Sequence, residues 1–306
     1  MGLLLSSISQ GLLWSVMAIG IYITYRILDV ADLTAEGSFP LGAAISSSLI
    51  VSGVAPWLSV LIALAGGMLA GFISGFLYTK WKIPALLSGI ITMTGLYSIN
   101  LRIMGKANVT LLGQGTIFRT LEGYGLSKTN AVLVLGTLIV LAVIAVLRFF
   151  FHTEIGLAVR ATGDNNEMSE ANGIRTNVTK VIGYMLSNGL VALSGALLAQ
   201  NNGYADISMG IGTIVIGLAS IIIGEVIMKN LTLAKRLLTV VVGSIIYRLL
   251  ILAVLEMRVL EMRVDPQDLK LFSAILLALA LRMPVIREWF SKRFGRKQDA
   301  KTKELT

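Results

Sequence analysis

The sequence contains no cysteine and only one histidine, His152. The absence of cysteine excludes disulfides, Cys-ligated zinc, iron–sulfur clusters and thiol catalysis, and a single histidine cannot build a multi-histidine metal site. Charged residues are also scarce, at 14% of the 306 residues, whereas a soluble domain carries about 25%. This composition excludes an ordinary soluble enzyme.

Apolar residues make up 55% of the chain, and the mean hydropathy is +0.81. They form long runs, several of which reach the roughly 20 residues that a helix needs to cross a bilayer. We therefore predict an all-α, polytopic membrane helix bundle. Small residues at Gly67, Gly71 and Gly75 repeat every four positions, a pattern that lets helices pack closely in lipid. We expect nine spans, at 11–30, 41–54, 57–79, 84–101, 131–151, 179–199, 210–228, 237–256 and 269–283.

The charge distribution predicts how the bundle is oriented. Lysine and arginine number 26 against 17 acidic residues, a net charge of +9. The nine-span arrangement places Lys80, Lys82, the 152–178 loop and the tail at 284–306 on one side. Since cytoplasmic loops carry the excess of lysine and arginine, we predict that this side is cytoplasmic and the N-terminus is outside. The same rule accounts for the positive charge without a nucleic-acid partner.

A polar segment from Asp29 to Gly42 interrupts two apolar runs. Carboxylates inside hydrocarbon are costly, but they are tolerated where broken backbone lines a wet cavity. Broken helices of this kind often mark a substrate path. We therefore predict that part of the translocation pathway or its gate is formed by Asp32, Thr34, Glu36 and Gly37. The alternative is an ordinary charged cytoplasmic loop.

Arg248 lies within the predicted span 237–256 and needs an acceptor there. The candidates are Asp32, Glu36 or the carboxylate of a substrate, because guanidinium binds carboxylates through two hydrogen bonds. We assign Arg248 to the pathway, with a structural ion pair as the alternative. Glu225 precedes Lys229 by four residues, a spacing that predicts an ion pair on one helix face.

The predicted cytoplasmic loop at 152–178 carries the signature of two short helices. The first covers about 155–161 and ends at a C-cap at Thr162–Gly163. The second begins at Asp164 as N-cap, with Glu167 three residues later in a capping box, and Gly173 ends it. A short helix pair with small side chains suits docking into a groove of a partner protein. A solvent-exposed linker is the alternative.

Three stretches together resemble a known family: YRILDVADLTAEGSFPLGAA (25–44), EIGLAVRATGDNNEMSEANGI (154–174) and MGIGTIVIGLASIIIGE (209–225). They are similar to the permease subunits of ABC importers of the branched-chain amino acid and ribose type. The DLTAEGSF stretch most resembles the tryptophan/tyrosine subgroup. The coupling segment of that family matches at Gly156, Arg160, Ala161, Gly163, Asn165 or Asn166, Ala171, Gly173 and Ile174.

The resemblance implies a permease domain over 1–283 in a bacterial cytoplasmic membrane, and no enzyme activity in this chain. It implies a second permease copy, forming a homodimer, and two cytoplasmic ABC ATPase subunits that carry the ATP and magnesium. An external solute-binding protein would deliver a small solute, which the resemblance implies to be an amino acid of the aromatic class. ATPase coupling would fall to Gly156, Arg160, Ala161, Gly163, Asp164, Asn166, Glu167, Ala171 and Gly173.

Two other functions remain open from the residues alone. An ion-coupled secondary transporter would use titratable groups within the membrane, for which Asp32, Glu36 and Glu225 could serve. The permease of an ABC exporter would share the ATPase partner but would need no solute-binding protein. An intramembrane enzyme is disfavoured because the sequence offers no nucleophile with a matching base.

Overall fold

The computed structural model describes residues 2–123, 125–227 and 232–256, together with Leu271, Ala274, Ile275 and Ala278. The long helices are α1 (Gly2–Tyr22), α2 (Ala35–Val51), α3 (Pro56–Thr79), α4 (Ala85–Met104), α6 (Lys128–Phe150), α9 (Thr176–Asn202), α10 (Thr213–Ile227) and α11 (Leu233–Glu256). The shorter elements are η1 (Ile23–Ile27), β1 (Asn108–Thr110), α5 (Ile117–Glu122), α7 (Glu154–Asp164), α8 (Asn166–Ala171), β2 (Tyr204–Asp206) and η2 (Ile207–Gly210).

Seven helical segments among the described residues are long and apolar enough to cross a membrane. They are Gly2–Ile27, Pro56–Thr79, Ala85–Met104, Lys128–Phe150, Thr176–Asn202, Ile207–Ile227 and Leu233–Val254. The predicted second span, 41–54, falls on α2, which has 17 residues and is shorter than the roughly 20 that a straight crossing needs. Of the predicted ninth span, 269–283, only four residues are described, and the tail at 284–306 lies outside the described residues.

Helix boundaries follow local chemistry. Pro56 opens α3, a position where its missing N–H costs nothing because the first helical N–H groups have no partner within the helix. Gly203 ends α9 with a φ of +79°, a left-handed conformation that glycine adopts without strain. Its N–H donates to the carbonyl oxygen of Ala199 at 2.9 Å.

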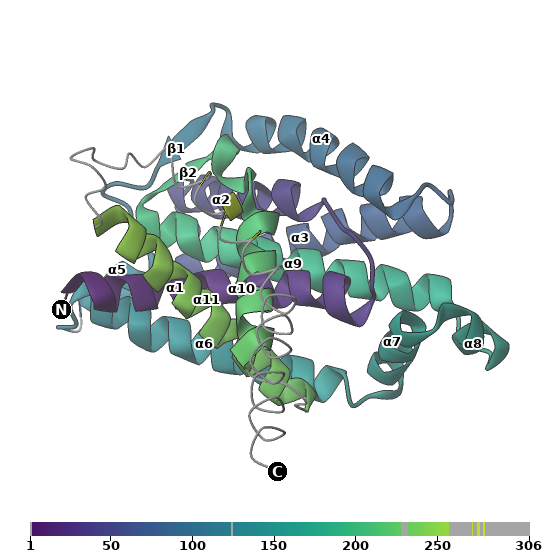
Figure 1. Ribbon diagram of the computed structural model, residues 1–306. Helices are drawn as coiled ribbons and strands as arrows, with labels where there is room; N and C mark the ends of the chain where they lie inside the picture. The colour runs from purple at the N-terminus through teal and green to yellow at the C-terminus, as the bar shows by residue number, and fades with distance from the viewer. Residues whose placement is uncertain are drawn as a thin grey trace, which may run out of the picture.

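The centre of the bundle is formed by α1 and α9, with α2 beside them (Figure 1). The predicted glycine face of α3 packs on α9: a Cβ added at Gly67 would lie 2.4 Å from the carbonyl oxygen of Asn188, and one at Gly71 would lie 2.2 Å from that of Tyr184. Backbones therefore meet directly, as expected for helices that associate in lipid through small residues.

The two ends of the bundle are distinct. The α3–α4 connection and the α7–α8 pair lie at one end, on the right in Figure 1, while the N-terminus and the β1–β2 ladder lie at the other. The amine of Lys180, at the start of α9, lies 5.3 Å from the ring centroid of Tyr78, near the end of α3. The antiparallel ladder pairs Asn108 with Asp206 and adds a short sheet to the predicted all-α fold.

Candidate functional site: a broken helix, a cavity and a coupling hairpin

The predicted break between the first two helices is present at residues 28–34, whereas the rest of the predicted polar segment, 35–42, is helical and belongs to α2. After η1 the chain turns at Asp29, whose φ is +53°, and α2 then begins partway along its neighbours. The N–H of Thr34 donates to Asp32 Oδ1 at 2.9 Å, a local turn that aspartate favours. The Thr34 hydroxyl donates to Ser74 Oγ of α3 at 2.8 Å, so the break is tied to the neighbouring helix.

Asn188, near the middle of α9, holds the other side of the break. Its Nδ2 donates to Asp32 Oδ2 at 2.7 Å, and its Oδ1 accepts from the Ser38 hydroxyl at 2.7 Å. Asn188 and Ser38 are fully buried, and buried polar groups are tolerated when hydrogen bonds satisfy them. Asp32 and Thr34 therefore stabilise the broken backbone. Sequence reasoning overlooked Asn188, although an amide inside the predicted span 179–199 was a signal.

Glu36 and Gly37 lie on the other face of α2 and border a cavity of about 410 Å³. Glu36 Oε1 accepts from the N–H of Gly212 at 3.0 Å, and the carbonyl oxygen of Gly37 accepts from Asn100 Nδ2 of α4 at 3.2 Å. The cavity lies between α2, α4 and η2 and is lined by Glu36, Gly37, Pro40, Met93, Thr94, Tyr97, Asn100, Ile207, Ser208 and Ile211.

The predicted pairing of Arg248 with Asp32 or Glu36 is wrong. The guanidinium carbon lies 4.2 Å from the ring centroid of Trp14, and the buried Nε has no hydrogen-bond partner. The reason is that α11 packs directly on α1. The guanidinium of Arg248 therefore lies against Trp14 of α1 and not beside the break. The same ring stacks on Phe39 of α2, with centroids 5.3 Å apart. Arg248 therefore makes a cation–π contact.

Glu225 pairs with Arg26 of η1. Arg26 Nε donates to Oε1 at 2.7 Å and Nη2 donates to Oε2 at 2.5 Å, a two-point contact typical of arginine and carboxylate. The predicted partner Lys229 lies outside the described residues. This ion pair joins the end of α1 to α10, a contact that spacing along one helix could not predict.

The loop at 152–178 forms two short helices, as predicted, but with different caps. Gly163 lies inside α7 and does not end it, and the N-cap of α8 is Asn165 in place of Asp164. Asn165 Oδ1 accepts from the N–H of Met168 at 2.9 Å, the bond that an N-cap makes. The helix persists through Gly163 because that residue is packed against the bundle. Gly173, with a φ of +81°, follows the end of α8 as predicted.

Close backbone contacts fix this helix pair to the bundle. A Cβ at Gly163 would lie 1.7 Å from the carbonyl oxygen of Ile27 in η1, and one at Gly156 would lie 2.0 Å from that of Phe150. The hydroxyls of Thr162 and Thr179 lie 2.7 Å apart. We call residues 154–171 the coupling hairpin, after the role that the family resemblance predicts for it; these contacts hold it against the bundle.

The other predicted coupling residues lie on or near the surface of the hairpin. Arg160 and Asp164 border a cavity of about 190 Å³ together with Tyr22, Arg26 and Arg236. Ala161 is half-buried, Glu167 and Ala171 are exposed, and Asn166 Nδ2 donates to Glu170 Oε1 at 3.3 Å. The Thr176 hydroxyl donates to the same Glu170 oxygen, and this bond lowers the pKa of the carboxyl.

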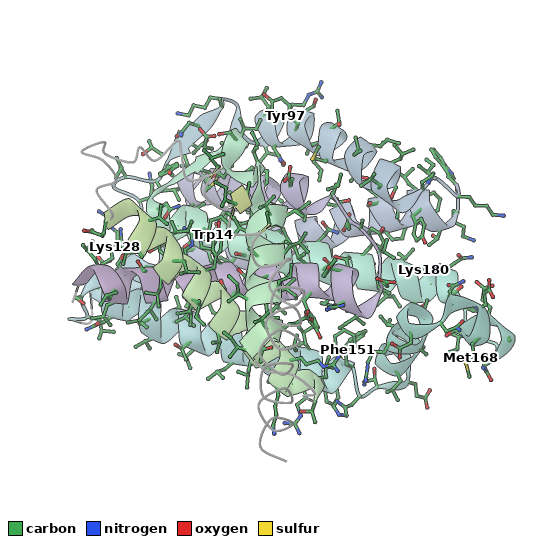
Figure 2. All side chains as sticks on the ribbon, in the orientation of Figure 1. Trp14, Tyr97, Lys128, Phe151, Met168 and Lys180 are labelled. Carbon is green, nitrogen blue, oxygen red and sulfur yellow. The ribbon has the colours of Figure 1, made fainter. Side chains whose placement is uncertain are left out.

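The hairpin also presents large apolar side chains to its surroundings. Ile155 is 54% exposed, Leu157 is 51% exposed and Met168 is 65% exposed, and Figure 2 shows Met168 at the far end of the bundle. Ile155 and Leu157 lie two positions apart on α7 and Met168 lies on α8, so both short helices expose apolar surface. Docking of a partner on this helix pair stays a prediction.

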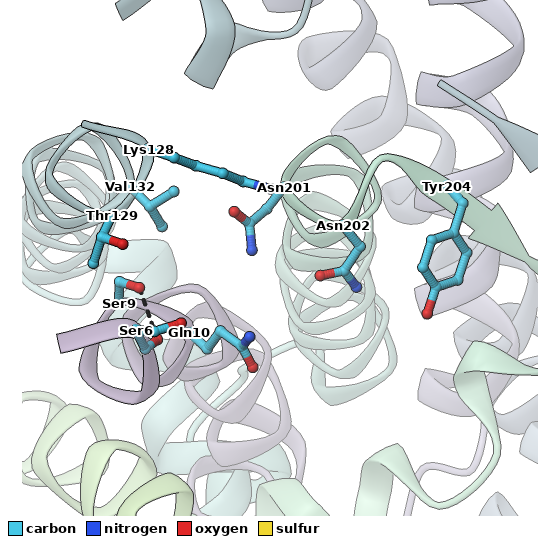
Figure 3. Close-up of a pocket in the computed structure, with 9 residues that line it drawn as sticks. All are labelled: Ser6, Ser9, Gln10, Lys128, Thr129, Val132, Asn201, Asn202 and Tyr204. Atoms are coloured by element: carbon cyan, nitrogen blue, oxygen red, sulfur yellow. Dashed lines mark hydrogen bonds between the residues drawn. The ribbon is translucent and has the colours of Figure 1, made fainter. Parts of the chain in front are cut away.

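A third cavity, of about 370 Å³, lies at the opposite end between α1, α6 and α9. Figure 3 shows Lys128 extending across it toward Asn201, with the Ser9 hydroxyl bonded to the carbonyl oxygen of Ser6 at 2.8 Å. Its wall is almost entirely polar, in contrast to the cavity beside Glu36, so the two sites would suit different chemistry.

The sequence is similar to known proteins over most of its length. Residues 3–281 match the family model described as branched-chain amino acid transport system / permease component. The chain is 41% identical over 274 residues to the tyrosine transport system permease protein of Clostridioides difficile strain R20291, covering 90% of this chain and 88% of that one. It is 33% identical to an uncharacterized protein of Rickettsia prowazekii strain Madrid E, covering 92% and 97%.

A solved structure shows the same fold. PsaBC from Streptococcus pneumoniae, in complex with Fab, aligns with a TM-score of 0.50 at 12% identity, covering 91% of this chain and 89% of that one. The family match favours the ABC permease over the secondary transporter that the sequence left open. The chain therefore belongs to the branched-chain amino acid transport system permease family, and it is a multi-pass membrane subunit of an ABC transporter in which a partner ATPase, and not this chain, uses ATP.

Proposed function

We propose that this chain imports an aromatic amino acid across the bacterial cytoplasmic membrane as one of two identical permease subunits. The α7–α8 end faces the cytoplasm and binds ATPase subunits, and an external solute-binding protein delivers the substrate to the opposite end. The substrate class is supported by the 41% identity to a tyrosine transport permease. The orientation is supported by the basic residues Lys80, Lys82 and Lys180, which gather at the α7–α8 end.

The coupling hairpin is the observation that carries this proposal. An element that transmits force must be stiff, and its Gly156 and Gly163 lie in backbone contact with the bundle. It must also offer a partner a surface, and Ile155, Leu157 and Met168 are exposed there. Because Gly163 meets η1, the element next to the break, movement of the hairpin would reach the Asp32–Asn188 contact directly.

The absence of cysteine in the chain permits a direct test of docking. A Met168→Cys variant is labelled with a photoactivatable maleimide and assembled with the partner ATPase subunits. Illumination should join the permease to an ATPase subunit. The matched control is Leu112→Cys, 81% exposed in the loop after β1 at the opposite end, which should give no such product. A product from the Leu112→Cys variant alone would reverse the orientation.

Transport is tested in liposomes that contain the permease, its ATPase and its solute-binding protein. Labelled L-tyrosine should accumulate only when ATP is supplied on the ATPase side and the binding protein on the other. Accumulation of a branched-chain amino acid or ribose in place of tyrosine would disprove the substrate class. Binding-protein-independent efflux would indicate an exporter.

A further inference from the structure

Asn100, which borders the cavity between α2, α4 and η2, has one buried side-chain atom that the protein leaves unsatisfied. Asn100 is fully buried, and its Nδ2 donates to the carbonyl oxygen of Gly37 at 3.2 Å. Its Oδ1 is also buried but accepts no hydrogen bond. A buried acceptor without a donor is destabilising, and a ligand donating to this oxygen would remove that cost.

The charge at this cavity favours a cationic donor. Glu36 borders the same space, with its Oε1 held by the N–H of Gly212. Among the described residues that line the cavity there is no lysine, arginine or histidine. An amide oxygen and a carboxylate in one wall attract a positively charged donor such as an ammonium group.

The rest of the wall suits an aromatic ring. Pro40, Met93, Tyr97 and Ile211 contribute apolar or aromatic surface, and thioethers and aromatic rings make favourable contacts with a ring placed between them. The volume of about 410 Å³ lies within the range of small-molecule sites. Tyr97 is 56% exposed on the outward face of α4 (Figure 2), which leaves an open side.

From these observations we propose that this cavity is an amino-acid station on the permease itself. Asn100 rotates its buried Oδ1 toward the cavity and, together with Glu36, receives the ammonium group. The wall around Tyr97 holds the aromatic side chain, and the substrate carboxylate points to the open side. The proposal rests on the proposed function and adds to it a selectivity site in this chain, separate from selection by the external binding protein. Asn100 would be a binding residue that no sequence motif identifies.

Cysteine protection tests the station. Thr94 lines the cavity and is exposed, and its hydroxyl donates to the carbonyl oxygen of Ile90 within its own helix. In the permease–ATPase complex, alkylation of a Thr94→Cys variant by N-ethylmaleimide should slow several-fold with L-phenylalanine or L-tyrosine. The desamino analogue 3-phenylpropionate should give no protection. The control Thr129→Cys, in the cavity of Figure 3, should be alkylated equally under all conditions.

A matched pair of substitutions isolates the acceptor. Asn100→Leu and Asn100→Asp both lose the donor to Gly37, but only the aspartate keeps an oxygen toward the cavity. In the Thr94→Cys background, Asn100→Leu should raise the half-protecting concentration of L-phenylalanine about tenfold, and Asn100→Asp should retain protection. Equal effects of the two substitutions, or equal protection by 3-phenylpropionate, would overturn the station.

Transport measurements separate the two proposals. If the unmodified complex accumulates L-tyrosine with ATP but neither aromatic amino acid protects the Thr94→Cys variant, the station is wrong and the proposed function stands. Protection by D-ribose in place of the aromatic amino acids would refute the ligand chemistry assigned to the cavity. Protection by L-phenylalanine that is lost in Asn100→Leu would support it.

Discussion

Replacing Gly163 with alanine should uncouple ATP hydrolysis from transport. An added Cβ would lie 1.7 Å from the carbonyl oxygen of Ile27 and 2.9 Å from Cα of Leu28, whereas carbon–oxygen contacts lie at about 3.3 Å or more. The hairpin would therefore have to retreat by roughly 1.5 Å. Both clashing atoms are backbone atoms, one in Ile27 at the end of η1 and one in Leu28, which follows it. No flexible side chain can therefore move aside.

Two opposing energies decide whether Gly163→Ala strengthens or weakens the attachment of the hairpin to η1. Alanine is preferred over glycine inside a helix by about 1 kcal/mol, which would favour α7 on its own. Overpacking against fixed atoms costs typically about 1–3 kcal/mol. Here the clashing atoms belong to the backbone, which cannot move aside as a side chain can. We expect the contact to dominate, so the hairpin detaches from η1 while the bundle stays folded.

The assay is the ratio of labelled L-tyrosine accumulated to ATP hydrolysed in liposomes. We expect Gly163→Ala to reduce this ratio at least about tenfold, equivalent to 1.4 kcal/mol. The control is Gly95→Ala in α4, where nothing lies within 4 Å of the added Cβ. A Gly163→Asn variant adds a second test. Asparagine would be tolerated if Gly163 were a left-handed C-cap, but in contact with Ile27 it should lower the ratio as alanine does. A wild-type ratio in Gly163→Ala would refute the reasoning.

Two further predictions concern local contacts. Asn165→Ala should destabilise α8 by about 1 kcal/mol and speed hydrogen exchange at the amide of Met168, whereas Asp164→Ala should leave that amide unchanged; the opposite pattern would restore the capping box. A double-mutant cycle on Trp14→Leu and Arg248→Met, followed by thermal unfolding of the purified complex, should give a coupling energy of about 0.5–2 kcal/mol, and strict additivity would show that the cation–π contact contributes nothing.

Local patterns in the sequence were sufficient to predict the main helices and the break between the first two. Apolar runs predicted the long helices because burial in lipid depends on each segment's own composition. The Asp29–Gly42 interruption predicted the break, and the glycine spacing on α3 predicted close packing. The two short helices of the hairpin were also predicted, since helix propensity acts over only a few residues, but the predicted caps at Gly163 and Asp164 were wrong.

The contacts between distant segments were decided only by the tertiary structure. Arg248 meets Trp14, and Asp32 meets Asn188, because helix packing brings together residues more than 150 positions apart. The role of Gly163 changed for the same reason: its neighbour Ile27 is remote in sequence, so a cap was the simplest local interpretation. Propensity and periodicity report on a residue's chain neighbours, whereas partner choice depends on which helix faces meet in space, and that is set by the packing of the whole bundle.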